Sequence, residues 1–267
     1  YRHQAPHSWG FLFVGCWVDL VMENHKGFIV LVDISGYTNF VSGHNINYAE
    51  NNKLSKGQAH AEHIISDLLE KVIDELDGVL IINKLEGDAA LFYAIPDDPN
   101  DLSEKIIKKL QTSFKIFNQR INEIRFCETW TCGTCAEVGD LKLKSFVHFG
   151  EFLIKKINQF KEIAGQDVIL AHRLMKNSIS VSEYMLFTRS FSEIKNLNSL
   201  GSIEERKEKY DGLGSVDCSV FYPNPELYQL EISKKKSWFG NIFALAKYFI
   251  NSKSKKDIEK KYNLIGS

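Results

Sequence analysis

The 267-residue chain lacks a strong net charge and a long apolar run, and each absence excludes a class of protein. Its 33 lysines and arginines nearly balance its 34 aspartates and glutamates, so no overall field favours a nucleic-acid partner. Residues 9–17 are apolar, but Asp19 follows soon after, and the run is too short to span a bilayer. The N-terminal region also lacks a convincing basic start and cleavage site, as a signal peptide requires.

Cysteine is scarce and odd in number. Five cysteines without a clear secretory signal fit a reducing compartment, so we expect a cytoplasmic protein. Because Met22 lies almost directly before the first predicted strand, we expect residues 1–21 to be an upstream extension that is not native; a membrane-seeking arm is the alternative. The 44% hydrophobic content is enough for one sizeable core with appendages.

The segment from residue 26 to residue 40 organises the chain. Five apolar residues, 28–32, run directly into Asp33 and are bounded by Gly27 and Gly36, which predicts a buried central strand. The turn that follows, at 35–38, could open a helix. A carboxylate at a strand end, followed by the free N–H groups of a helix start, suits a metal ion that carries phosphates. A helix N-cap aspartate is the alternative interpretation of Asp33.

The next segments alternate between strand and helix patterns. Apolar residues at helical spacing predict helices that begin near residues 61 and 102, and the polar stretch 42–55 predicts a loop. The segment 84–88 predicts a tight glycine turn between two strands, with Asp88 just past its tip. Further strands are predicted at 141–149 and 184–188, the second being the last of the domain, and a helix at 167–174. One more strand is possible at 227–232, beyond the domain.

One segment decides the predicted topology. Residues 152–160 fit either a strand or a short helix, and as a strand they give the order β-α-β-β-α-β-β-α-β. That order predicts an α+β fold with a ferredoxin-like β-α-β-β-α-β core, in which helices pack on a central, mostly antiparallel sheet.

The regular pattern ends near residue 190. We expect one domain over residues 22–190, a charged and turn-rich peripheral segment over 191–233, and a basic aromatic helix or linker over 234–267. A basic aromatic helix can make peripheral contact with an anionic membrane. A helix that docks on this domain, or that leads to another domain, is the alternative.

Three cysteines are closely spaced in the middle of the chain. Cys132 and Cys135 form a Cys-x-x-Cys turn that can place two thiolates on one metal, and Cys127 could be a third ligand of a structural Zn²⁺. His148 and Cys218 are the candidates for the fourth ligand. Buried free thiols and a redox pair are the alternatives.

Four motifs together resemble those of the class III adenylyl and guanylyl cyclase catalytic domains, and most of all a divergent bacterial branch of uncharacterised proteins. They follow the family order and span roughly residues 27–190. In sequence order they are Val32-Asp33-Ile34-Ser-Gly-Tyr-Thr-Asn-Phe40, Lys84-Leu-Glu-Gly-Asp88, His148-x-Gly150 and Gly165-x-x-Val168-x-x-Ala171-x-Arg173-Leu174.

The resemblance implies a nucleotide cyclase type of fold and a role for particular residues. Asp33 and Asp88, with the Ile34 carbonyl, would hold two Mg²⁺ or Mn²⁺ ions, and Arg173 would neutralise transition-state charge at the α-phosphate. Lys84 would recognise the base with Glu162 as its partner. The turn residues that would contact the nucleotide are Ser35, Gly36, Tyr37 and Thr38.

The resemblance also implies a homodimer, because the family's sites lie between two domains packed head to tail. Two departures stand against efficient catalysis. Ile169 occupies a position where the family has an asparagine that contacts ribose, and Glu162 stands where it has aspartate. The cysteine cluster is also foreign to the usual cyclase core.

Three hypotheses follow. The first is a cyclase that converts ATP, or another nucleoside triphosphate, to the cyclic nucleotide and pyrophosphate. The second is a catalytically weakened homologue that binds nucleotide as a sensor or scaffold. The third is an unrelated metal-dependent phosphotransfer enzyme on a ferredoxin-like fold.

Overall fold

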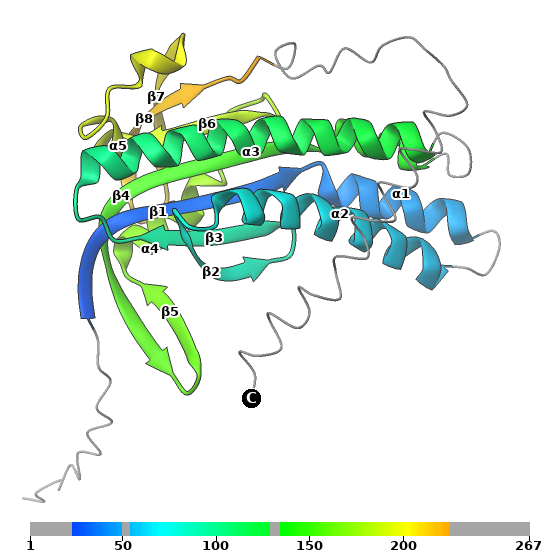
Figure 1. The fold of residues 1–267 in the computed structure, drawn as a ribbon, viewed down its shortest axis with the longest axis horizontal. Helices are drawn as coiled ribbons and strands as arrows, with labels where there is room; N and C mark the ends of the chain where they lie inside the picture. Colours follow the sequence, from blue (N-terminus) through cyan, green and yellow to red (C-terminus); the bar gives the residue numbers. More distant parts are fainter. Residues whose placement is uncertain (1–22, 50–53, 129–133, 225–267) are drawn as a thin grey trace, which may run out of the picture.

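The structure is a computed structural model that describes residues 23–49, 54–128 and 134–224 (Figure 1). Its centre is an eight-stranded sheet in the order β2-β3-β1-β4-β6-β8-β7, with β5 paired to β4. Every strand pairing is antiparallel except β4 with β6. The strands are β1 Glu23–Ser35, β2 Ile81–Glu86, β3 Ala89–Ala94, β4 Lys142–Ile157, β5 Phe160–Ala164, β6 Tyr184–Thr188, β7 Ile203–Tyr210 and β8 Gly214–Phe221.

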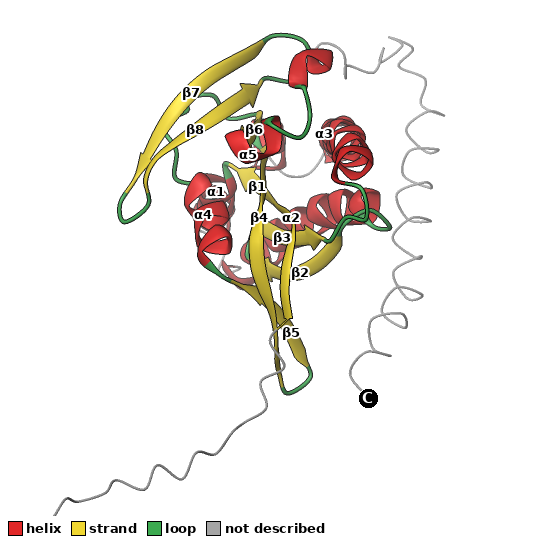
Figure 2. Ribbon diagram, turned by 90° about the vertical axis from the view of Figure 1, so that its left-hand side faces the viewer, coloured by secondary structure: helices red, strands yellow, loops and turns green. Residues whose placement is uncertain are grey.

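Helices cover both faces of this sheet. The α-helices are α1 Tyr37–Ala49, α2 Leu54–Leu76, α3 Pro99–Glu128, α4 Gln166–Leu174 and α5 Arg189–Ser192, and the 3-10 helices are η1 Thr134–Asp140 and η2 Leu197–Leu200. The long helices α2 and α3 pack on one face, and α4 packs on the other. Figure 2 shows α3 and α4 on opposite sides of the strands.

The β1 strand is the centre of the core. Its residues 28–32 are fully buried, and they alternate between the two faces because successive side chains of a strand point in opposite directions. Phe28, Val30 and Val32 join the core under α2 and α3, whereas Ile29 and Leu31 join the core under α4. Each such side chain contributes about 1.5–3 kcal/mol by leaving water, so this strand is a rigid base for the residues at its end.

The predicted fold class is confirmed. The order through β6 is β-α-β-β-α-β-β-α-β once α1 and α2 are taken as one helical connection, and the sheet is mostly antiparallel, as expected. Residues 152–157 continue β4, and the hairpin that β5 closes projects from the body of the domain (Figures 1 and 2).

Two local predictions were wrong. Residues 42–49 belong to α1 and not to a loop, because the helix that begins at Tyr37 continues through this polar stretch. Polar side chains are compatible with a helix whose backbone groups bond to one another. The strand 184–188 is also not the last, since β8 pairs with β6 and β7 pairs with β8. The charged segment after residue 190 therefore adds a hairpin to the same sheet.

The predictions for residues 1–21, for the basic C-terminal segment 234–267 and for a strand near residue 230 lie outside the described residues. Among the helices that the structure describes, none is long and apolar enough to cross a membrane.

Candidate functional site

Asp33 lies near the end of β1, where the buried strand meets the helical connection. In the sheet it stands opposite Ala89 of β3 on one side and Lys144 of β4 on the other. Burial, together with the negative charge of Asp88 and against the partial opposition of Lys144, raises the pKa of the Asp33 carboxyl to about 6. The ionised form of a carboxyl group in this position is disfavoured, and a nearby cation would stabilise it.

Asp88 is in the turn between β2 and β3, directly beside Asp33. The Ile34 amide donates a hydrogen bond of 3.1 Å to the Asp88 carbonyl, which fixes the turn against the end of β1. Burial also raises the pKa of Asp88, a backbone hydrogen bond lowers it, and the charge of Glu62 on α2 raises it. No motif in the sequence indicated Glu62, whose position next to the turn depends on how α2 packs.

The Asp33 and Asp88 pair fits a divalent cation by its donor chemistry. Both ligands are hard carboxylate oxygens, which Mg²⁺ and Mn²⁺ prefer, and the charge of Asp88 opposes the ionisation of Asp33. Within the described residues no group of three or more His, Cys, Asp or Glu side chains could hold a metal ion. Two carboxylates would therefore need the backbone, water or substrate oxygens to complete the coordination.

The turn after β1 opens α1 as expected. Gly36 has a φ of +94°, a conformation that L side chains rarely adopt, and its carbonyl accepts the first helical bond from Phe40. The N–H groups in the first turn of a helix have no partner within the helix, so the amides of Tyr37 and Thr38 face the region ahead of α1. The Tyr37 hydroxyl donates a 2.6 Å hydrogen bond to Glu62, which raises the pKa of Tyr37 to about 12.

Lys84 on β2 belongs to a polar cluster that the motif alone did not reveal. Its ammonium lies 2.6 Å from a carboxylate oxygen of Glu86, and the other oxygen of Glu86 lies 3.3 Å from His172 of α4. Burial lowers the pKa of His172, while the charge of Glu86 raises it. The two-residue alternation of a strand places Lys84 and Glu86 on the same face of β2, so this pair could have been found from the sequence.

Glu162, the expected partner of Lys84, pairs with a different lysine. It stands opposite Lys155 in the β4–β5 pairing, and the two side chains approach to 3.4 Å. The two strands are nevertheless neighbours, because Asn83 of β2 donates a hydrogen bond to the Lys161 carbonyl of β5.

Arg173 is exposed in the last turn of α4. The buried face of this helix consists of Val168, Ala171 and Leu174, so Arg173 points away from the core. Among the described residues no ion pair joins Arg173 to a carboxylate, Asp33 and Asp88 included. Ile169, one turn earlier, is 55% exposed.

A partly buried network fixes the start of α4. Asp167 accepts a 2.6 Å hydrogen bond from the Glu151 amide and lies 3.5 Å from Nε2 of His148, whose Nδ1 is 2.9 Å from the Thr188 hydroxyl. The nearby His148 holds the pKa of Asp167 below its usual range. A β-carbon at Gly150 would overlap both Asp167 and His148, so the His-x-Gly motif makes room for this contact.

The predicted zinc ligands cannot be placed in the same way. The side chains of Cys127, Cys132 and Cys135 lie outside the described residues, and the zinc site stays a prediction. Cys218 is a free, buried thiol on β8 whose pKa burial raises to about 12.

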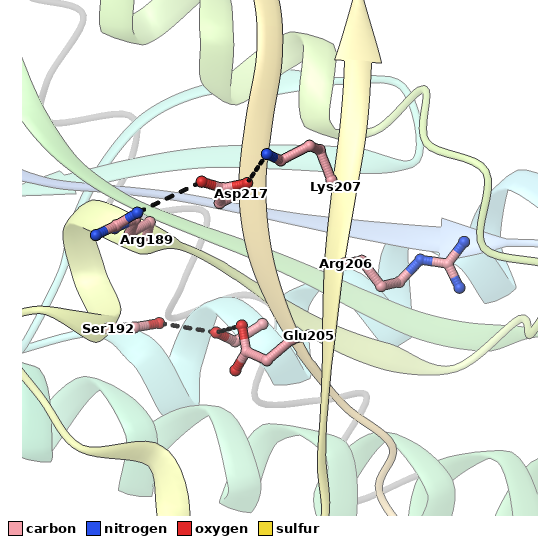
Figure 3. Close-up of a pocket in the computed structure, with 7 residues that line it drawn as sticks. Arg189, Ser192, Glu205, Arg206, Lys207 and Asp217 are labelled. Carbon is pink, nitrogen blue, oxygen red and sulfur yellow. Dashed lines mark hydrogen bonds and ion pairs between the residues drawn. The ribbon is translucent and has the colours of Figure 1, made fainter.

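A cavity of about 480 Å³ lies at the other edge of the sheet from β2, on β7, β8 and α5 (Figure 3). Its cations are matched by carboxylates: Asp217 pairs with both Arg189 and Lys207, at 3.6 and 3.2 Å. Glu205 accepts a hydrogen bond from Ser219, and Arg206 extends away from these pairs. This balanced set gives no specific indication of a ligand.

Comparison of the sequence with known families and proteins gives two matches without an assigned function. Residues 65–184 match a family model described as "Protein of unknown function (DUF2652)". A protein of Mycobacterium tuberculosis, described as uncharacterised, is 36% identical over 124 residues, which are 46% of this chain and 57% of the relative. The chain thus spans little more than half the length of that relative.

Solved structures identify the fold. The adenylyl cyclase CyaB of P. aeruginosa superposes with a TM-score of 0.54 at 13% identity, covering 77% of this chain and 98% of that one. The guanylyl cyclase Cya2 gives 0.55 at 12% identity, covering 76% and 95%. At this identity the likeness shows the fold alone, which is that of the adenylyl and guanylyl cyclase domains.

Proposed function

We propose that this protein is a class III cyclase-like enzyme that binds a nucleoside triphosphate with two divalent metal ions and converts ATP to cyclic AMP and pyrophosphate. The main support is the placement of Asp33 and Asp88, two carboxylates with raised pKa values, at adjacent strand ends of a cyclase-domain fold. Their fit to hard divalent cations is the chemistry that such a reaction requires.

The residues of the chain have distinct parts in this proposal. Asp33, Asp88 and the Ile34 carbonyl would hold Mg²⁺ or Mn²⁺, which supplies activation of the attacking oxygen and stabilisation of the leaving one. The first-turn amides of α1 would bind phosphate oxygens, and Lys84 would contact the base. Arg173 would neutralise charge at the α-phosphate while the ribose 3′-oxygen, having lost its proton, bonds to phosphorus and the bond to pyrophosphate breaks.

The exposed position of Arg173 supports a site shared by two copies. Arg173 lies on α4, on the other face of the sheet from α2 and α3, and points away from its own core. A two-fold homodimer would bring the Arg173 of one protomer to the Asp33 and Asp88 of the other, twice.

Exposed apolar side chains offer such a dimer a surface to bury. Leu85 on β2 and Phe160 on the projecting hairpin are 58% and 63% exposed. Ile82 and Leu85 also line a groove of about 370 Å³ against α2. Large apolar side chains grouped at the surface commonly mark an interface.

Ile169 supports a second candidate function. Its exposed hydrocarbon side chain stands where the related cyclases would hydrogen-bond the ribose, and it cannot form that bond. A protein that binds nucleotide with weakened or absent catalysis, as a sensor or scaffold, is therefore the alternative.

One experiment separates these functions. Purified protein is incubated with ATP or GTP and Mn²⁺, and the products are analysed by mass spectrometry alongside calorimetric measurement of nucleotide binding. A cyclic product supports the enzyme, binding without turnover supports the sensor, and any other product supports a different phosphotransfer reaction. Asp33→Ala and Asp88→Ala should abolish metal-dependent binding, whereas Asp101→Ala, at an exposed aspartate of α3, should not. Equal binding in all three variants would contradict the metal site.

A further inference from the structure

The cluster of Lys84, Glu86 and His172 lies at an open surface between β2 and α4. The side chains of Lys84, Glu86 and His172 are 41%, 30% and 26% exposed. They come from two segments that are far apart in the sequence, and Glu86 is their common partner. Neither Glu86 nor His172 takes part in the proposed metal site or in transition-state stabilisation.

Glu86 retains hydrogen-bonding capacity in this arrangement. One of its oxygens faces Lys84 at 2.6 Å and the other faces His172 at 3.3 Å. A carboxylate offers about four lone pairs, so each oxygen can accept a further hydrogen bond. The Lys84 ammonium has three N–H donors and needs only one for Glu86. The cluster can therefore accept a hydrogen bond from one group of a ligand and donate a hydrogen bond to another group at the same time.

The charge of the cluster suits a neutral polar ligand. The positive charge of Lys84 is balanced by Glu86, and burial shifts His172 toward its neutral form. A phosphate group would meet a carboxylate here, at a cost in free energy. A nucleobase carries no charge and presents donors and acceptors along one edge.

An apolar contact lies beside the polar cluster. Ile169 and His172 are three residues apart on α4, so their side chains share one face of the helix. Ile169 is 55% exposed on that face. The flat face of a nucleobase can pack on the hydrocarbon side chain of Ile169. The edge of the same base can then reach Lys84 and Glu86.

We propose that Lys84, Glu86 and His172 form the base-recognition site, in which Glu86 accepts from an exocyclic amino group and Lys84 donates to a ring nitrogen or carbonyl oxygen. This inference rests on the proposed function and deepens it, since it names the specificity residues. It replaces Glu162 by Glu86 as the partner of Lys84, because Glu162 is paired with Lys155.

The test compares nucleotides that differ by one amino group. Calorimetry with Mn²⁺ measures the dissociation constants of ATP against purine riboside triphosphate, which lacks the 6-amino group, and of GTP against inosine triphosphate, which lacks the 2-amino group. Wild-type protein should prefer the amino form in at least one pair by about tenfold or more, as expected for a hydrogen bond to a charged acceptor. Glu86→Ala should remove that preference, and Glu86→Gln, which keeps an acceptor oxygen, should restore part of it.

Glu162→Ala is the matched control and should leave the preference unchanged. If Glu162→Ala removes the preference and Glu86→Ala retains it, Glu162 is the specificity residue and the inference is wrong. If the wild type binds nucleotides without any preference for the amino form, the inference also fails, although the proposed function stands. If the wild type binds no nucleotide with Mn²⁺, the proposed function fails, and the inference fails with it.

Discussion

The raised pKa of Asp33 makes a specific prediction about stability and pH. A carboxyl whose pKa is raised in the folded state stabilises the protein fully below its unfolded value, near 3.8, and this contribution is lost as the pH rises through the folded value of about 6. Ionised Asp33 should therefore cost about 2–3 kcal/mol at pH 8 relative to a neutral group of the same shape, after allowance for its partial exposure.

Asp33→Asn supplies such a neutral group. In the absence of divalent cations it should increase the free energy of unfolding by about 2–3 kcal/mol at pH 8 and change it little at pH 4, where Asp33 of the folded protein is protonated and the difference between folded and unfolded ionisation is small. Urea unfolding, followed by circular dichroism at the two pH values, measures this difference. Asp101→Asn on the exposed face of α3 is the control and should shift stability little at either pH.

A divalent cation should reverse the effect. Added Mn²⁺ stabilises the folded wild type if it binds there, by about 2.7 kcal/mol at one hundred times its dissociation constant, and should stabilise Asp33→Asn far less. If Asp33→Asn destabilises the protein at pH 8, or changes stability equally at both pH values, the prediction is wrong. In that case burial and the charge of Asp88 do not disfavour the ionised form of Asp33. If Mn²⁺ stabilises both proteins equally, the cation binds elsewhere.

Two further predictions concern the shared site and the start of α4. Mixing the inactive variants Asp33→Ala and Arg173→Ala should restore part of any cyclase activity, because some heterodimers contain one intact site; an inactive mixture with demonstrated subunit exchange would contradict the shared site. Gly150→Ala should lower the free energy of unfolding by about 1–3 kcal/mol, because its methyl group overlaps Asp167 and His148, and thermal unfolding measures this. A Gly150→Ala protein as stable as wild type would show that the network moves aside at little cost.

Much of the fold could be predicted from the sequence because the core elements carry their own local signals. The apolar run 28–32 is a strand buried on both faces, the helical spacing of 64–76 is a helix buried on one face, and a glycine turn joins β2 to β3. These patterns depend only on how regularly side chains return to the same face of a strand or a helix. They also place Asp33 near the end of β1, directly after the apolar run, and Asp88 directly before β3.

The wrong predictions concern segments whose secondary structure depends on tertiary contacts and not on their own hydrophobic pattern. The polar segment 42–49 lacks an apolar face, yet it continues α1, which packs on α2. The strand β7 is half exposed and mostly charged, and it forms because β8 offers it a partner for its backbone groups. Hydrogen bonding to a neighbouring strand is a property of the folded sheet and leaves little trace in the hydrophobic pattern.

The sequence by itself determined which carboxylates end the central strands, since Asp33 and Asp88 adjoin apolar segments whose burial is dictated by their composition. Only the tertiary structure decided the partners of the site. Glu62 reaches Tyr37 through the packing of α2 on α1, and His172 reaches Glu86 through the packing of α4 on β4 and β1. These contacts join residues between 25 and 86 positions apart, by the numbering of each pair, and such distant pairs are set by how helices pack on the sheet and not by any local repeat.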